Sequence, residues 1–124
     1  MKISFGENSK LGVKPDSREK IRKFYGNVLG CRIVEKEDVD IVWIGTSFHI
    51  AMRYEVTASS EDDLLNSIWL ELRVDEPNEL KKRILEFGIK EIEYWDKEHF
   101  YFQAPGGQVF RLVQNTEEMT KWRE

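Results

Sequence analysis

Side chains that could bind or transform a small molecule recur at every second position of several strand-like segments. Residues 67–74 alternate most regularly: apolar residues fall on one face, and Trp69, Glu71 and Arg73 fall on the other. The same alternation in neighbouring segments adds further polar and aromatic side chains to this second face. The expected ligand-binding residues are therefore His49, Arg53, Trp69, Glu71, Arg73, Tyr101, Gln103 and Arg111.

The arginines say most about the chemistry of such a face. Guanidinium groups bind carboxylates and phosphates through paired hydrogen bonds, and Trp69 offers a flat ring for stacking. We therefore expect a locally cationic cavity for a small, partly aromatic molecule that could be anionic. The alternative is equally open: the arginines could form ordinary ion pairs with Glu71 on an exposed face. Trp69 could likewise fill the core or contact a second copy.

The two histidines and the single cysteine are weaker candidates. Histidine titrates near neutral pH, so His49 could act as a general base, although a lone strand histidine is more often structural. His99 follows a charged Asp-Lys-Glu turn, and we expect it to be solvated. Cys31 follows a predicted helix end and is expected to be a small core residue. One cysteine and two histidines make neither an internal disulfide nor a zinc-finger site.

The elements that must position these residues are strands and two amphipathic helices. In the first half, a strand is predicted at residues 2–5 or 10–13, and a helix starts at residues 15–17 with a capping box of Asp16 and Glu19. Apolar residues then recur at helical spacing, and Gly30 ends the helix. Strands follow at residues 31–35, 40–45 and 48–54, before a polar, acidic linker at residues 57–66.

The second half repeats this order. Residues 68–74 form a strand, Asp75 and Pro77 start a helix, and Gly88 ends it. Strands are predicted at residues 89–95, 99–104 and 108–114, with a helical stub carrying Trp122 in the tail. The nearest alternative, a ferredoxin-like domain, has only two strands between its helices, whereas four are predicted here. We therefore predict one α+β domain with module one at about 1–56, linker 57–66, module two at about 67–114 and tail 115–124.

This repeat resembles the vicinal oxygen chelate superfamily, which includes glyoxalase I, bleomycin-resistance proteins and extradiol dioxygenases. Residues 24–30 read Phe-Tyr-Gly-Asn-Val-Leu-Gly, where the superfamily commonly has Phe-Tyr-x-x-Val-Leu-Gly. Residues 100–112 are similar to its aromatic strand, Pro-x-Gly-Asn turn and closing strand. The resemblance implies that each βαβββ module curls into a half-barrel of mixed sheet whose concave side holds the site.

The resemblance also implies where a metal would bind, and there this sequence departs from the pattern. The second-half positions fall at Trp69 and Arg111, and the first-half positions fall near residues 7–10 and at Ala51. Tryptophan is not a metal ligand, and an arginine repels a divalent cation. We therefore expect no metal and no other cofactor.

Three functions remain open. The leading expectation is a glyoxalase- or bleomycin-resistance-like protein that binds a small molecule without metal; bleomycin itself is cationic and would suit an arginine-lined pocket poorly. The second is a metal-dependent lyase, isomerase or dioxygenase with unrecognised ligands among Glu7, His49, Glu71 and His99. The third is a dimeric interaction module without ligand, using Trp43, Trp95 or Trp122. Whether the protein catalyses a reaction stays open.

Composition limits the partners. The 124 residues carry a net charge of −4 without a basic cluster, which argues against nucleic acid. The sequence shows no apolar run suited to a membrane span and no signal-peptide pattern at its start. We therefore expect a cytoplasmic homodimer with a small-molecule ligand.

Overall fold

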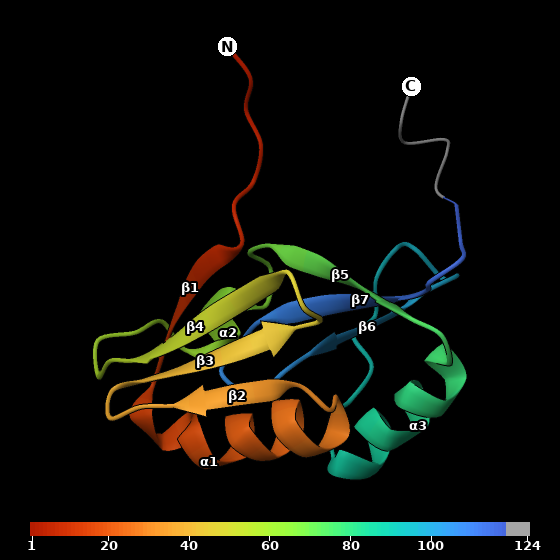
Figure 1. The fold of residues 1–124 in the computed structure, drawn as a ribbon. Helices are drawn as coiled ribbons and strands as arrows, with labels where there is room; N and C mark the ends of the chain where they lie inside the picture. Colours follow the sequence, from red (N-terminus) through yellow and green to blue (C-terminus); the bar gives the residue numbers. More distant parts are fainter. Residues whose placement is uncertain (119–124) are drawn as a thin grey trace.

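Two sheets lie side by side over two helices in the computed structural model, which describes residues 1–118 (Figure 1). The first sheet has the order β1-β4-β3-β2, with β1 parallel to β4 and the other neighbours antiparallel. Its strands are β1 (Asn8–Val13), β2 (Arg32–Glu35), β3 (Val39–Ile44) and β4 (Phe48–Tyr54).

The second sheet repeats this arrangement with one strand fewer. Its order is β5-β7-β6, with β5 parallel to β7 and β6 antiparallel to it. The strands are β5 (Trp69–Val74), β6 (Phe100–Gln103) and β7 (Val109–Gln114). Together with the helices they form the α+β architecture that the sequence pattern predicts.

The first helix changes its winding along its length. It begins as a tight turn, η1 (Pro15–Ser17), continues as α1 (Arg18–Ile21) and widens into η2 (Arg22–Val28). The widening shows in the Leu29 N–H, which donates to the Phe24 carbonyl five residues back. Pro15 fits the start because its missing N–H would have no partner there.

The predicted capping box of the first helix is wrong. Among the described residues, neither the cap of η1 nor that of α1 makes a side-chain bond to the backbone. A capping box occurs instead in the linker, where Ser60 and Asp63 bond reciprocally at the start of α2 (Glu61–Leu64). The hydroxyl of Ser60 suits this role, and the short helix orders part of the predicted linker.

One apolar core joins both halves. Ile21, Phe24 and Tyr25, which belong to the predicted helical stripe, are fully buried. The Phe24 ring lies 5.5 Å from Phe87 at the end of α3 (Pro77–Phe87) and 5.8 Å from Phe102 of the second sheet. Because these rings meet edge-on or tilted, they also add favourable aromatic geometry to the buried area. The helices therefore hold the two sheets in fixed positions.

Three predicted elements differ from the structure. Residues 2–5 form no strand; they belong to an extended arm, and the first strand lies at Asn8–Val13. Residues 89–95 form only one bridge, between Glu91 and Phe102, because Tyr94 leaves the ladder to pack its ring 4.5 Å from Tyr101. Ile68, predicted for the core face, precedes β5 and is 63% exposed.

The tail prediction can be assessed only in part. Residues 115–116 form a turn, in which the Glu117 N–H donates to the Gln114 carbonyl, rather than the start of a helix. Trp122 lies outside the described residues. None of the helices within residues 1–118 is long and apolar enough to cross a membrane.

Candidate functional site

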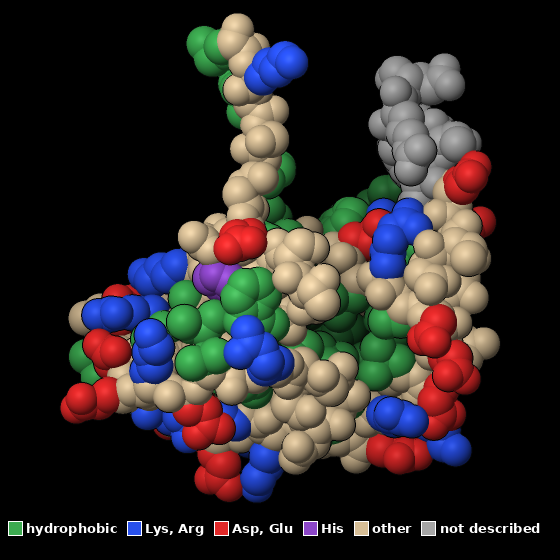
Figure 2. Space-filling view, in the orientation of Figure 1, with side chains coloured by type: hydrophobic (Ala, Val, Ile, Leu, Met, Phe, Trp, Pro, Cys, Tyr) green, Lys and Arg blue, Asp and Glu red, His purple; other side chains and the backbone are tan. Residues whose placement is uncertain are grey.

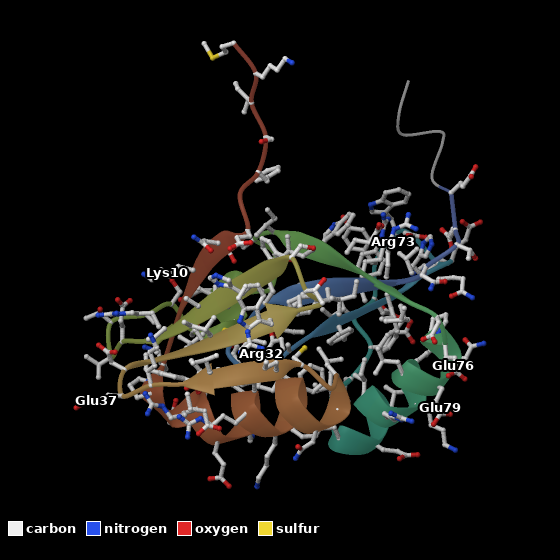
Figure 3. The ribbon with its side chains drawn as sticks, viewed as in Figure 1. Lys10, Arg32, Glu37, Arg73, Glu76 and Glu79 are labelled. Carbon is white, nitrogen blue, oxygen red and sulfur yellow. The ribbon has the colours of Figure 1, made fainter. Side chains whose placement is uncertain are left out.

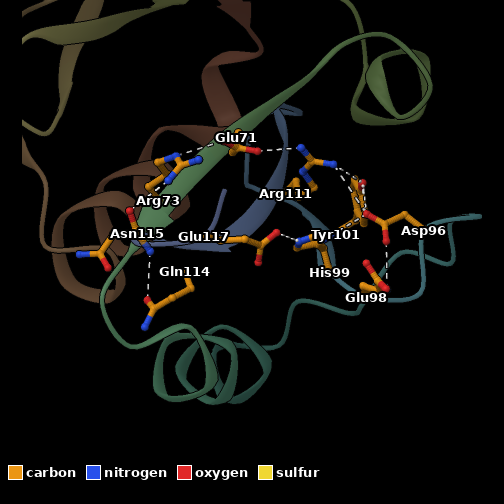
Figure 4. Close-up of polar contacts among 10 residues, drawn as sticks. All are labelled: Glu71, Arg73, Asp96, Glu98, His99, Tyr101, Arg111, Gln114, Asn115 and Glu117. Carbon is orange, nitrogen blue, oxygen red and sulfur yellow. Dashed lines mark hydrogen bonds and ion pairs between the residues drawn. The ribbon is translucent and has the colours of Figure 1, made fainter. Parts of the chain in front are cut away.

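The face of the second sheet opposite α3, here called the site face, carries three polar residues directly across from one another. Glu71 on β5 is paired with Arg111 on β7, which is paired with Tyr101 on β6. The Arg111 Nη2 donates to Glu71 Oε1 at 2.7 Å, and its Nη1 donates to the Tyr101 hydroxyl at 3.3 Å (Figure 4). The strand register thus turns three separate segments into one hydrogen-bonded row.

Two more predicted residues join this row. The Arg111 guanidinium carbon lies 4.3 Å from the centre of the Trp69 ring, and Trp69 meets Tyr101 edge-on at 5.8 Å. Arg73 reaches back to Glu71, with its Nε 3.3 Å from Oε2. Figure 3 shows Arg73 at the opposite end of the molecule from Glu37. Five of the eight predicted residues therefore lie together.

Residues that sequence reasoning missed complete the network. Asp96 accepts hydrogen bonds from the Tyr101 hydroxyl at 2.9 Å and from the Glu98 N–H at 3.0 Å, and lies 3.6 Å from Arg111. Tyr94 receives a long hydrogen bond of 3.4 Å from the Trp69 indole N–H. Asp96 stood in what the sequence presents as a charged turn, so no local signal marked it as buried against the sheet.

The prediction that His99 is solvated is wrong, because two carboxylates enclose its ring. Its side chain is 7% exposed, with Nδ1 2.7 Å from Asp96 and Nε2 2.6 Å from Glu117. Both ring nitrogens can donate only in the protonated form. Burial works against that charge, but the hydrogen bonds to Glu117 and Asp96 outweigh it and raise the pKa of His99. The imidazolium thus ties the segment after β7 to the loop before β6.

The same contacts act on Asp96. Burial alone would raise its pKa, but the hydrogen bonds from His99, the Glu98 N–H and Tyr101 lower the pKa of Asp96 to about 2. The carboxylate is therefore charged at neutral pH. Two arginines and one imidazolium face Glu71, Asp96 and Glu117, so the site face is balanced in charge rather than cationic as expected.

A cavity of about 210 Å³ lies beside the network. Its walls combine the start of β5, the irregular segment after α3 and the adjoining strands of the second sheet. The lining residues are Leu65, Asn66, Ser67, Ile68, Trp69, Ile92, Glu93, Tyr94, Tyr101 and Val109. Arg111 is 9% exposed beside this wall, and its Nε has no hydrogen-bond partner among the described residues. The cavity lining is thus mainly aromatic and apolar, and Arg111 contacts it through the Trp69 ring.

The other three predicted residues make their contacts elsewhere. His49 packs its ring 4.6 Å from Trp43 on the first sheet. Arg53 is exposed and pairs with Asp38 at 3.2 Å. Gln103 donates to the backbone carbonyls of Glu61 and Gly107, and so joins α2 to the turn before β7. Alternation identified the face of each strand but not which faces meet.

The positions at which the superfamily resemblance implies metal ligands do not fit a divalent cation. Trp69 and Arg111 contact each other, and Ala51 lies opposite Lys10 in the first sheet. Within residues 1–118, one cluster has three potential ligands with donor atoms within 4.8 Å, namely Asp96, Glu98 and His99. Both ring nitrogens of His99 are already engaged, Nδ1 by Asp96 of this cluster and Nε2 by Glu117 outside it.

Solved structures with the same fold include enzymes and binding proteins. The trypanothione-dependent glyoxalase I of Leishmania major is 18% identical, with a TM-score of 0.70 over 98% of this chain and 94% of that one. The fosfomycin resistance protein FosX of Mesorhizobium loti is 15% identical, with a TM-score of 0.68 over the whole of both chains. The antibiotic-binding protein TnmS3 of Streptomyces sp. CB03234 is 21% identical, with a TM-score of 0.66 over 92% of this chain and 98% of that one.

No protein-family model matches the sequence, and no curated protein matches it either. Identities of this size show a shared fold and leave the activity to be argued from the site. The order of strands and helices agrees with the motifs at residues 24–30 and 100–112. The chain therefore has a glyoxalase-like fold.

Proposed function

We propose that this protein binds a small, partly aromatic molecule in the cavity beside Trp69, without a metal ion. The observation that carries the proposal is an aromatic cavity whose wall residue Trp69 contacts a buried arginine with an unused N–H. Pockets that combine apolar walls with a few polar groups are typical ligand sites. The fold is compatible with such a role, since TnmS3 is described as an antibiotic-binding protein.

The size of the cavity limits the ligand. Its 210 Å³ is smaller than the roughly 300–1,000 Å³ of pockets for drug-sized molecules. A ligand of about one ring with a short substituent suits this space. Trp69, Tyr94 and Tyr101 line it, which favours an aromatic over an aliphatic ring.

An acidic substituent would complete the fit. The Arg111 Nε–H is buried and lacks a partner, which is costly unless an acceptor arrives. The rest of that guanidinium is held by Glu71 and Tyr101, so the donor is fixed in direction before the ligand binds. A ligand carboxylate that reaches the Arg111 Nε would accept from this donor.

Metal independence forms part of the proposal. Trp69 supplies no ligand atom, and the Arg111 guanidinium adds positive charge where a cation would lie. A bound metal would have to displace Arg111 from Glu71. The alternative, a metal-dependent enzyme, would require that displacement and is tested by the same experiment.

The test is ligand-detected NMR with single-ring carboxylates and their uncharged amide analogues, on freshly purified protein with and without chelator. We expect saturable binding that chelator leaves unchanged. Tyr94→Ala should abolish it, and Arg111→Lys should weaken the carboxylates about tenfold more than the amides, because lysine lacks the fixed Nε–H. Arg53→Lys on the first sheet is the matched control and should change nothing.

Two outcomes would contradict the proposal. One is the absence of binding in both ligand classes by protein whose circular dichroism shows it folded. The other is stoichiometric zinc, nickel, manganese or iron whose removal abolishes binding, which would favour the enzyme.

A further inference from the structure

Residues 1–6 form an extended arm that runs away from both sheets (Figure 1). The arm starts where β1 ends its pairing: the His49 N–H donates to the Glu7 carbonyl at 2.8 Å, the last bond of this ladder. Beyond it, Ile3 is 86% exposed and Phe5 is fully exposed. Exposure of two large apolar side chains to water is unfavourable, so burying them would lower the free energy.

The residue pattern of the arm is that of an extended segment that can pair with the edge of a β-sheet. Ile3 and Phe5 fall on one side of an extended chain, and Lys2 and Ser4 fall on the other. Residues 2–5 contain no proline, so every amide can donate to a neighbouring strand. These features favour addition to a sheet edge, with main-chain bonds giving affinity and the apolar pair giving register.

The second sheet offers a matching edge at β5. This strand lies at the end of its sheet, with β7 as its sole neighbour among the described strands. Just before it, Leu65 and Ile68 are exposed by 37% and 63%. The exposed acidic residues Glu61, Asp62 and Asp63 of α2 precede them and complement Lys2 of the arm. The acidic residues of α2, the exposed apolar residues and the free β5 edge therefore follow one another along residues 61–74.

We propose that the arm of one copy adds as a strand along β5 of a second copy, with Ile3 and Phe5 packed on Leu65 and Ile68. Because each copy carries both an arm and a free β5 edge, the exchange can be reciprocal and closes a two-fold dimer. The arm of each copy runs away from its own body, so the partner's edge is the favoured acceptor. Leu65 and Ile68 also line the cavity, so the partner's arm covers its wall.

Figure 2 shows a separate hydrophobic area over the first sheet, bordered by Lys and Arg side chains. On this sheet Ile41 and Trp43 are half-buried, and Arg32 lies over the Trp43 ring at 5.3 Å. That area is partly covered by its own basic side chains, whereas the arm has no cover at all. The arm is therefore the stronger determinant of association.

The first test is the mass of the full chain by light scattering across protein concentration. We expect a dimer that Phe5→Asp weakens at least tenfold while circular dichroism stays unchanged, because the arm lies outside the core. Leu85→Asp is the matched control: Leu85 is 43% exposed on α3, away from arm and edge, and the dimer should persist. A monomeric wild type, or a Phe5→Asp dimer of unchanged affinity, would overturn the proposal.

The second test identifies the acceptor edge. Phe5→Cys and Ile68→Cys are made in separate chains that carry Cys31→Ser, differ in mass and are mixed under mild oxidation. A disulfide-linked heterodimer is expected, and its yield should drop to background when Phe5→Cys is paired with Leu85→Cys. In one chain carrying Phe5→Cys and Ile68→Cys, closure within a monomer would show that the arm covers its own edge and would exclude the exchange. Neither test depends on ligand binding.

Discussion

The two modules share an order of elements but place their buried charges on opposite faces of their sheets. In the first, Arg22 of η2 donates to Asp40 of β3 at 2.8 Å, and Tyr54 of β4 donates to the same carboxylate at 2.8 Å. This cluster lies between helix and sheet, and Asp40 is fully buried. In the second, the charges lie on the site face beside the cavity. The first cluster therefore holds a helix on its sheet, and the second borders the cavity of the second module.

The first sheet has a strand, β2, that the second sheet lacks, and this difference explains why a cavity adjoins the polar network of the second module. In the first sheet, β2 pairs with β3 over its whole length. The corresponding segment of the second module, residues 89–95, bonds once through the Ile92 N–H to Tyr101 and then leaves the sheet. Its departure carries Tyr94 and Asp96 over the site face, where they form a wall and a hydrogen-bond acceptor. The loss of one strand pairing thus creates the cavity.

The largest expected effect lies in the first module. Asp40→Ala removes the sole carboxylate that Arg22 and Tyr54 share inside the core, leaving the hydroxyl buried without that partner. We expect a loss of about 3–5 kcal/mol in the free energy of unfolding, measured by urea titration. Asp38→Ala, which removes the exposed partner of Arg53, is the control and should change that free energy by less than about 1 kcal/mol. Similar losses in the two variants would contradict the contrast.

The turns before the last strands of the two modules give the next largest effect. Gly45 and Gly106 have φ values of +69° and +92°. A Cβ on Gly45 would meet nothing within 4 Å, whereas one on Gly106 would lie 2.9 Å from Ile21 and 3.0 Å from Val13. Gly45→Ala should cost about 1 kcal/mol from backbone conformation alone. Gly106→Ala should cost about 3 kcal/mol, because overpacking adds to it. Equal shifts in the urea midpoint for the two variants would show that the core around Gly106 rearranges to accommodate the added methyl group.

Alternation and turn residues predicted most of the fold. The strand at residues 48–54 has the predicted bounds, and Gly30 and Gly88 take the positive φ expected of helix ends. The same alternation placed Glu71, Tyr101 and Arg111 on one face, where the register brings them into contact. Those features depend on spacing along the chain, which the sequence contains.

The rest of the site depends on contacts between distant segments. Residues 89–95 resemble a strand locally, and what removes them from the ladder is the packing of Tyr94 on Tyr101. His49 and Arg53 lie on the predicted face of β4, but that face belongs to the other sheet. His99 was expected in water because its sequence neighbours are charged, yet one of them, Asp96, turns inward with it, while Lys97 and Glu98 stay exposed. Periodicity carries no information on which surfaces meet.

The smallest expected effect concerns the pH dependence of the contribution of His99 to stability. The titratable groups around His99 are Asp96 and Glu117, which bond to its ring, with Lys81, Glu91, Lys97 and Glu98 around the adjoining pocket. The pKa of His99 is raised on folding, so its stabilising contribution is fully present below the unfolded value of about 6.5 and is lost as pH rises through the folded value. The wild type should therefore exceed His99→Gln by about 1–2 kcal/mol in unfolding free energy at pH ~5.5, and by less at pH ~9. Urea titrations at both pH values measure these differences, and an NMR titration of the His99 ring gives the folded pKa directly. A difference between wild type and His99→Gln that grows with pH would contradict the raised pKa and show that the ring is neutral in the folded protein.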